Sequence, residues 1–125
     1  MKVNVADFAN LLLLAVPAAL QGKLQGAAVV PSEEIPPDVV TMQSRVVLAE
    51  DATGRRRTVS LVYPAEADAA ASRISVLDAL GMQLFGASLG ETIVVDTPEG
   101  LRRLRVEQII YQPEHSMRTH LFVRG

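Results

Sequence analysis

The chain has 125 residues, 49% of them hydrophobic and 21% charged, which is typical of one ordinary globular domain and outside the range of disordered chains. It contains no cysteine, which excludes a disulfide framework and a thiolate zinc site. The formal net charge of −2 gives no overall attraction to nucleic acid, so such binding would have to come from a local basic patch.

The N-terminal region contains the apolar run "FANLLLLAVPAALQG", which has the length of a signal-peptide core. Asp7 lies in what would be the positively charged region, and Pro17 interrupts the run, so structural helices are favoured over a secretory signal. The run is also shorter than the about 20 residues of a membrane span. We therefore expect a folded, cytoplasmic protein.

Helical spacing predicts a hairpin of two short helices over residues 1–25, with Pro17 in the first turn of the second helix. The residues at helical spacing are Phe8, Leu11, Leu12 and Ala15. Leu13 and Leu14 add apolar side chains on another face, so the hairpin must either pack on its own domain or pair with a second copy. We expect a weak homodimer through this hairpin.

Residues 26–43 contain Pro31, Pro36 and Pro37 beside the acidic pair Glu33 and Glu34. Prolines fix φ and remove hydrogen-bond donors, so this segment is predicted to be an extended, stiff linker. The domain proper is expected at 44–114, followed by a C-terminal tail at 115–125.

Two β-hairpins are predicted in the domain. The first joins "SRVVLAED" to "RTVSLVYP" with Gly54 in the turn. The second turns at "TPEG" and alternates Leu104, Val106 and Gln108 on one face with Arg103, Arg105 and Glu107 on the other. At least four antiparallel strands follow from this pattern.

The stretch "GMQLFGAS", residues 81–88, nearly matches the phosphate-binding loop G-x-x-x-x-G-K-[ST], but Ala87 replaces the lysine. Leu80, Leu84 and Phe85 instead follow the stripe of a short helix. Gly86 then suits a left-handed helix terminator and Gly90 a turn into the next strand. The stretch is predicted to be structural, with no nucleotide bound there.

No group of residues indicates an active site. His115 and His120 are five residues apart in a polar tail, which suits neither one helical face nor one strand face. Ser75 and Ser88 have no histidine near them in sequence. We expect no enzyme activity, no cofactor and no metal ion.

Two basic clusters lie at the hairpins, "RRR" at 55–57 and "RRLR" at 102–105. If the hairpins lie side by side, Arg57, Arg103 and Arg105 form a modest positive patch, although solvated hairpin ends explain them equally well. The chain has two tyrosines, three phenylalanines and no tryptophan, too few aromatic platforms for free nucleic acid as the main ligand.

Residues 45–114 resemble the C-terminal domain of the bacterial transcript-cleavage factors GreA and GreB, and more closely the family of the regulator of nucleoside diphosphate kinase, Rnk. The stretches that carry the resemblance are "EEIPPDVVTMQSRV", "VYPAEAD", "ISVLDALGMQLFG" and "IIYQPE", in order and with matching gaps. The resemblance implies an α+β, FKBP-like fold, in which a twisted antiparallel sheet wraps a short helix, preceded here by the short helical hairpin.

The resemblance also implies a partner. Gre-type domains dock at the RNA polymerase secondary channel through a Ser-Pro-apolar-Gly loop, which is Asp78-Ala79-Leu80-Gly81 in this chain. Gre factors carry a long coiled coil with acidic, magnesium-binding residues at its tip, whereas the predicted hairpin is short and has no carboxylate around Val16 and Pro17. We therefore expect a regulator that binds polymerase without inducing transcript cleavage.

Two alternatives stay open. The FKBP-like fold also includes peptidyl-prolyl isomerases, although their aromatic-lined pocket is not matched by the few aromatic residues of this chain. A domain of this size with an apolar hairpin could also be an interaction module for some other protein.

Overall fold

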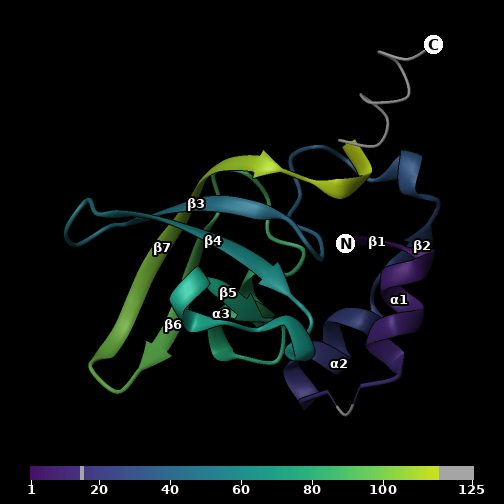
Figure 1. Cartoon of the computed structure of the whole chain (residues 1–125), viewed down its shortest axis with the longest axis horizontal. Helices are drawn as coiled ribbons and strands as arrows, with labels where there is room; N and C mark the ends of the chain where they lie inside the picture. The colour runs from purple at the N-terminus through teal and green to yellow at the C-terminus, as the bar shows by residue number, and fades with distance from the viewer. Residues whose placement is uncertain (15, 116–125) are drawn as a thin grey trace.

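A computed structural model describes residues 1–14 and 16–115. Its centre is a five-stranded sheet in the order β5-β4-β3-β7-β6, with a separate pair of strands, β1 and β2, beside the N-terminal helices. Figure 1 shows the sheet on one side of the molecule and the N-terminal elements gathered on the other. The α+β class expected from the sequence is confirmed.

Both predicted hairpins form. β3 (Arg45–Glu50) pairs antiparallel with β4 (Arg56–Val62), and Gly54 takes a positive φ of 71° in the turn between them. β6 (Thr92–Thr97) pairs antiparallel with β7 (Gly100–Tyr111), which also pairs along β3. The long β7 therefore joins the two hairpins into one sheet.

The alternation predicted along β7 stops at Val106. The β3–β7 register shifts between Val47 and Leu48, so that Val47 pairs with Gln108 and Leu48 with Val106, and Glu107 is the extra residue of a bulge. Val106 is buried and Gln108 is exposed. The expectation that Gln108 shares the face of Val106 was wrong because one inserted residue resets the inside–outside alternation.

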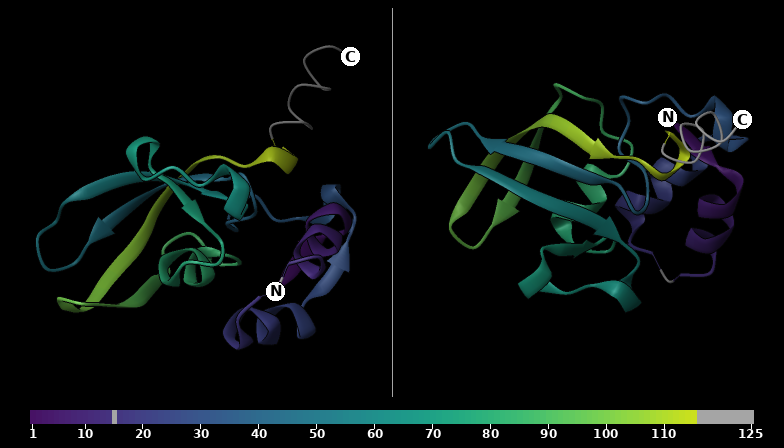
Figure 2. Two further views of the ribbon diagram at one scale, coloured as in Figure 1. Left: turned by 60° about the horizontal axis from the view of Figure 1, so that its bottom comes forward. Right: turned by 45° about the horizontal axis from the view of Figure 1, so that its top comes forward.

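The sheet is not purely antiparallel. β5 (Arg73–Ser75) follows two single-turn 3₁₀ helices, Pro64–Glu66 and Ala69–Ala71, and pairs parallel with β4 at the sheet edge. After β5 comes α3 (Ala79–Leu84), which the two views of Figure 2 show in the hollow of the curled sheet. Gly86 has φ 81° and Gly90 φ 86°, as predicted for a helix end and a turn.

The N-terminal residues form a β-α-α-β unit. β1 (Lys2–Asn4) leads into α1 (Val5–Leu12), α2 (Ala18–Gln25) follows Pro17, and β2 (Ala28–Val30) returns to pair parallel with β1. The two helices were predicted, whereas the parallel strand pair was not. Three-residue strands carry too little alternation to be recognised in a sequence.

The N-terminal unit packs on the domain. Leu11, Leu20 and Leu24 are buried in the same core as the inward-facing residues of β3, β4 and β7. Lys23 of α2 donates from Nζ to the carbonyls of Met82 (2.6 Å) and Phe85 (2.8 Å) at the end of α3. A cation there complements the partial negative charge of a helix C-terminus, so α2 is tied to α3 by polar and apolar contacts.

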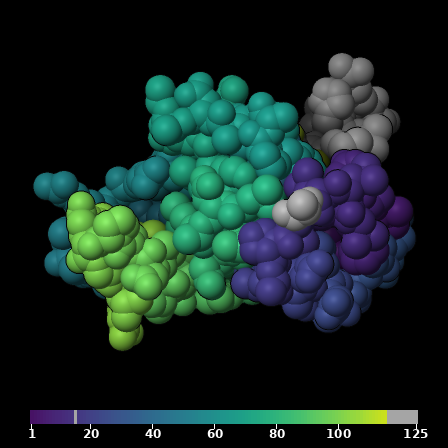
Figure 3. All heavy atoms as spheres, turned by 90° about the horizontal axis from the view of Figure 1, so that it is seen from below, coloured from purple at the N-terminus to yellow at the C-terminus, as the bar shows by residue number. Residues whose placement is uncertain are grey.

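The face of α1 differs from the prediction at Leu12. Leu12 is 60% exposed and Leu13 85% exposed, whereas Leu11 is fully buried and Leu14 is half-buried. Ala15, the last residue of the predicted stripe, lies outside the described residues. Space-filling Figure 3 shows the N-terminal residues lying directly against the residues around α3.

The proline-containing segment 26–43 carries β2, a 3₁₀ turn at Ser32–Glu34 and an isolated bridge between Val39 and Ser88. Ile35, Val40 and Met42 are each at most 1% exposed.

Within the described part of the chain, none of the helices combines the length and apolar character that crossing a bilayer requires. Of the predicted tail 115–125, only His115 belongs to the described residues.

Candidate docking site

The loop that leads into α3 goes from solvent into the core within four residues. Asp78 and Ala79 are exposed, Leu80 is half-buried and Gly81 is buried. Ser75 orders the loop, because its Oγ accepts from the Leu77 N–H (3.1 Å) and its carbonyl accepts from the Asp78 N–H (3.0 Å). The four residues predicted as a docking loop therefore form a fixed corner at the start of α3.

Gly81 fixes how closely α3 approaches the sheet. A Cβ at this position would overlap the Ser75 carbonyl oxygen and stand 2.9 Å from the Val76 Cα. Both obstacles are backbone atoms, which cannot move aside as a flexible side chain can. The position of Leu80 and Asp78 on the surface thus depends on the absence of a side chain at residue 81.

Leu80 lines one wall of a groove on the inner face of the curled sheet. The groove has a volume of about 780 Å³, and its floor is aliphatic, formed by Leu48, Val95 and Leu104. It has no aromatic residue in its lining, unlike the pocket expected of a prolyl isomerase. The groove and the loop Asp78–Gly81 together make a continuous surface with an apolar centre.

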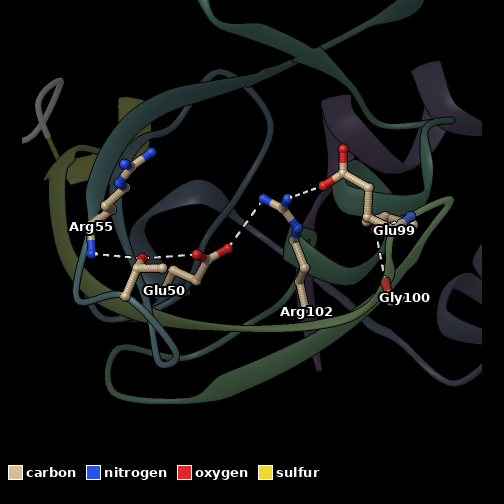
Figure 4. Close-up of polar contacts among 7 residues, drawn as sticks. Glu50, Arg55, Glu99, Gly100 and Arg102 are labelled. Atoms are coloured by element: carbon tan, nitrogen blue, oxygen red, sulfur yellow. Dashed lines mark hydrogen bonds and ion pairs between the residues drawn. The ribbon is translucent and has the colours of Figure 1, made fainter.

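Charged side chains surround this groove. Arg102 of β7 donates to Glu50 Oε2 (3.2 Å) and to Glu99 Oε2 (2.5 Å), and so links the end of β3 to the β6–β7 turn (Figure 4). Glu50 is further held by the Thr53 hydroxyl, which donates to its Oε1 (2.8 Å). Exposed ion pairs of this kind add little stability, but they fix the direction of side chains at the rim.

The predicted patch of Arg57, Arg103 and Arg105 is not one surface. Arg57 pairs with the buried Leu48, so it lies on the inner face and lines the groove. Arg103 pairs with the exposed Val94, which places it on the outer face of the sheet. Arg105 is on that outer face too, so the sheet separates it from Arg57.

Arg105 shares a carboxylate with a residue that the prediction omitted. Glu107 accepts from Arg56 Nε at 2.5 Å and from Arg105 Nη2 at 3.4 Å. The hydrogen bond from Arg56 is the main cause that lowers the pKa of Glu107. The positive charges of Arg56 and Arg105 are therefore partly neutralised by one carboxylate.

A buried polar junction, absent from the sequence-based prediction, joins the N-terminal unit to the domain. Asn4 caps α1 by accepting from the Asp7 N–H (2.8 Å), and its Nδ2 donates to Asp7 Oδ2 (3.0 Å) and Glu114 Oε2 (2.7 Å). Thr41 donates to the other Glu114 oxygen (2.9 Å), and Tyr63 donates to Asp7 Oδ1 (2.9 Å). Four separate segments of the chain meet at two carboxylates.

Burial at this junction raises the pKa of Asp7 to about 6, the nearby Glu114 adding to the rise while the hydrogen bonds from Tyr63 and Asn4 oppose it. Burial also raises the pKa of Tyr63. The signal in the sequence was the closing "YQPE". Gln112 of that stretch donates to the carbonyls of Pro36 (2.7 Å) and Val39 (2.8 Å), and Glu114 anchors the junction.

The serines and histidines of the predicted chemistry lie apart from one another. Ser75 is buried and bonds within the loop, and Ser88 is exposed on another turn. His115 is half-buried at the end of the described chain, and His120 lies outside it. No cluster of three or more potential metal ligands is found among residues 1–14 and 16–115.

Comparison with known proteins agrees with the fold. The family described as "Transcription elongation factor, GreA/GreB, C-term" matches residues 35–111. The chain is 37% identical over 102 residues to the regulator of nucleoside diphosphate kinase of Escherichia coli K12, a match that covers 81% of this chain and 75% of that protein. It is 30% identical to the transcription elongation factor GreA of Syntrophus aciditrophicus, where 75% of this chain matches 58% of GreA.

Solved structures give the same result. A prokaryotic transcription elongation factor GreA/GreB from Nitrosomonas europaea matches with a TM-score of 0.78 at 32% identity, over 89% of this chain and 98% of that one. The GreA factor homolog Gfh1 of Thermus thermophilus matches with a TM-score of 0.55, also at 32% identity, over 74% of this chain and 60% of that one. The longer factors thus contain a part that this chain does not match.

Proposed function

This chain belongs to the Rnk/Gre family of transcription factors through its GreA/GreB C-terminal domain, and from this membership we propose that it binds bacterial RNA polymerase at the secondary channel without stimulating transcript cleavage. The observation that carries the proposal is the surface made by the loop Asp78–Gly81 and the aliphatic groove beside Leu80. An ordered apolar surface with a charged rim is the usual anatomy of a protein docking site.

The N-terminal unit supports the second part of the proposal. α1 and α2 have eight residues each, so each is about 12 Å long at 1.5 Å per residue. The residues between them, 13–17, include no carboxylate to hold a magnesium ion. Such a hairpin supplies neither the reach nor the ligands that the resemblance assigns to a cleavage factor. Regulation by competition with other secondary-channel factors fits this arrangement.

The experiment has two readouts. Purified chain should bind core RNA polymerase in a pulldown, and Ala79→Arg should weaken binding because it places a long cation on the exposed loop of the docking surface. Ala19→Arg is the matched control, since it makes the same change at an exposed position in the first turn of α2. Equal binding by both variants would show that the docking surface is another part of the chain.

The second readout is RNA length in stalled elongation complexes. Addition of the chain should leave the intrinsic cleavage rate unchanged and should reduce cleavage stimulated by an added Gre factor. Shortening of the transcript by the chain alone would contradict the proposal. Absence of any binding to polymerase would favour the interaction-module alternative.

A further inference from the structure

A second hollow lies on the outer face of the sheet, away from the docking groove. The register pairs Arg45 of β3 with Ser60 of β4, and Ser60 with Arg73 of β5, so the three side chains share one face. Neighbouring strands are about 4.8 Å apart, so the two arginines stand about 10 Å apart on either side of Ser60. Tyr111 of β7 pairs with Arg45 on its other side and completes the row.

These residues line a hollow of about 470 Å³, together with Gln43 and Glu66. Arg45 and Arg73 are both exposed, and neither forms an ion pair with another residue in the described ranges, in contrast to Arg56, Arg102 and Arg105. Among residues 1–14 and 16–115, these two guanidinium groups therefore have no carboxylate partner, and they lie on opposite sides of one hollow. Arginine binds carboxylate and phosphate oxygens through two parallel N–H donors, and two arginines on one hollow suit a ligand that carries several phosphate groups.

An aromatic ring stands beside the arginines. Tyr111 lies at the end of β7 and is 42% exposed, and it is one of the residues that line the hollow. The flat face of such a ring stacks on a nucleobase, and this interaction is tolerant of base identity. A ligand with phosphates at one end and a planar ring at the other matches the row from Arg73 to Tyr111.

The rim of the hollow is held in a strained conformation. Gln43 has φ 67°, a left-handed value that residues other than glycine rarely adopt. Its backbone N–H donates to Leu61 O (2.7 Å), and its Nε2 donates to Glu66 Oε1 (2.6 Å). Strained residues fixed by several contacts gather at binding sites. Glu66 is thereby placed at the hollow, where its carboxylate can accept hydrogen bonds from sugar hydroxyls.

We propose that this hollow is a nucleotide-binding site, in which Arg45 and Arg73 hold the phosphates, Tyr111 stacks on the base and Glu66 accepts from the ribose. The site is separate from the stretch 81–88, whose glycines serve the fold. It is also independent of polymerase docking, because it faces away from the groove and needs only this chain.

The test is an NMR titration of the full, ¹⁵N-labelled chain with ATP, tripolyphosphate and adenosine. ATP should shift the amide signals of Arg45, Ser60 and Arg73 and the ring signals of Tyr111. It should bind about tenfold more tightly than tripolyphosphate, since base stacking adds to the phosphate contacts. Adenosine alone should bind more weakly than ATP. A single-stranded oligonucleotide serves as a further arm, and preferential binding of the strand over ATP would overturn the assignment to free nucleotide.

Variants decide whether the hollow is the site. Arg45→Gln combined with Arg73→Gln should weaken ATP binding at least tenfold, and Tyr111→Leu should reduce the affinity for ATP to that for tripolyphosphate. Arg103→Gln is the control, because Arg103 is exposed on the same face of the sheet outside the hollow. The ¹H–¹⁵N spectrum of each variant reports its fold. An equal loss in the Arg103 variant, or no shifts with millimolar ATP, would overturn the proposal.

Discussion

Gly81 packs its Cα against the backbone of Ser75, with no space between them for a methyl group. Gly81→Ala should therefore lower the free energy of unfolding by about 3 kcal/mol, because α3 must move off the sheet to accommodate a Cβ. Gly22→Ala is the control. Gly22 lies inside α2 with no atom within 4 Å of its added Cβ, so the same change should raise stability by about 0.5–1 kcal/mol. Urea denaturation of both variants measures the two effects, and equal effects would mean that α3 adjusts freely.

Asp7 should make the free energy of unfolding fall as the pH rises, which is the opposite of the usual effect of a carboxyl group. Its pKa is 3.8 in the unfolded reference and about 6 in the fold, so the folded state holds the proton more tightly. The stabilisation from this proton is complete below pH 3.8 and is lost as the pH rises through 6. Because Asp7 is only part-buried, solvent screening reduces the effect to about 1–2 kcal/mol.

Asp7→Asn tests this dependence. Residue 7 of the variant is uncharged at every pH. The parent chain should lose stability between pH 4 and pH 7, and the variant should not show this decrease. Thermal unfolding of both proteins at several pH values gives the comparison. Parallel pH curves for the two proteins would show that Asp7 does not titrate in this range.

Glu114 should be sensitive to replacement by its amide. Both of its oxygens accept hydrogen bonds, from Asn4 and from Thr41, and a glutamine would direct an N–H₂ group at one of these donors. Glu114→Gln should therefore cost about 1–3 kcal/mol, the range for a buried polar group left without a partner. Glu34→Gln makes the same change on the surface and should alter stability by no more than about 0.5 kcal/mol. Denaturant midpoints of the two variants provide the measurement.

Self-association is expected through Leu12 and Leu13. These side chains remain exposed after the hairpin has packed on the domain, and Val5 on the same face of α1 is 59% exposed. We predict a weak dimer at tens of micromolar, because burying a few such side chains barely exceeds the entropic cost of association. Replacing both leucines by glutamate should give a monomer in sedimentation experiments.

Two other substitutions complete this test. Leu101→Glu is the control, because Leu101 is exposed near the start of β7, outside the N-terminal hairpin, and this substitution should leave association unchanged. Leu11 is unsuitable because it is fully buried and a charge there would unfold the chain. A parent chain that sediments as a monomer would exclude the dimer.

The sequence predicted both hairpins, α3 and the glycine turns, because each of these elements depends on residues that are neighbours in the chain. The family could be predicted from short motifs in their order along the chain. Gly86 follows its own helix, and "TPEG" lies between its own strands. The division of the arginines between two faces could not be predicted, since it depends on which residue of β3 lies opposite Arg57. The bulge at Glu107 and the partners of Glu114 depend in the same way on distant segments.

The hydrogen bond between Asn4 and Glu114 also sets an order of events during synthesis. The two residues are 110 positions apart, which at about 5–20 residues per second corresponds to roughly 5–20 seconds on the ribosome. During that interval Leu11, Leu20 and Leu24 have left the exit tunnel before much of the core that buries them exists. The contacts of the residues made first are thus complete only after the last described strand, β7, has been made, and a chaperone that acts on the nascent chain would find its apolar target in α1 and α2.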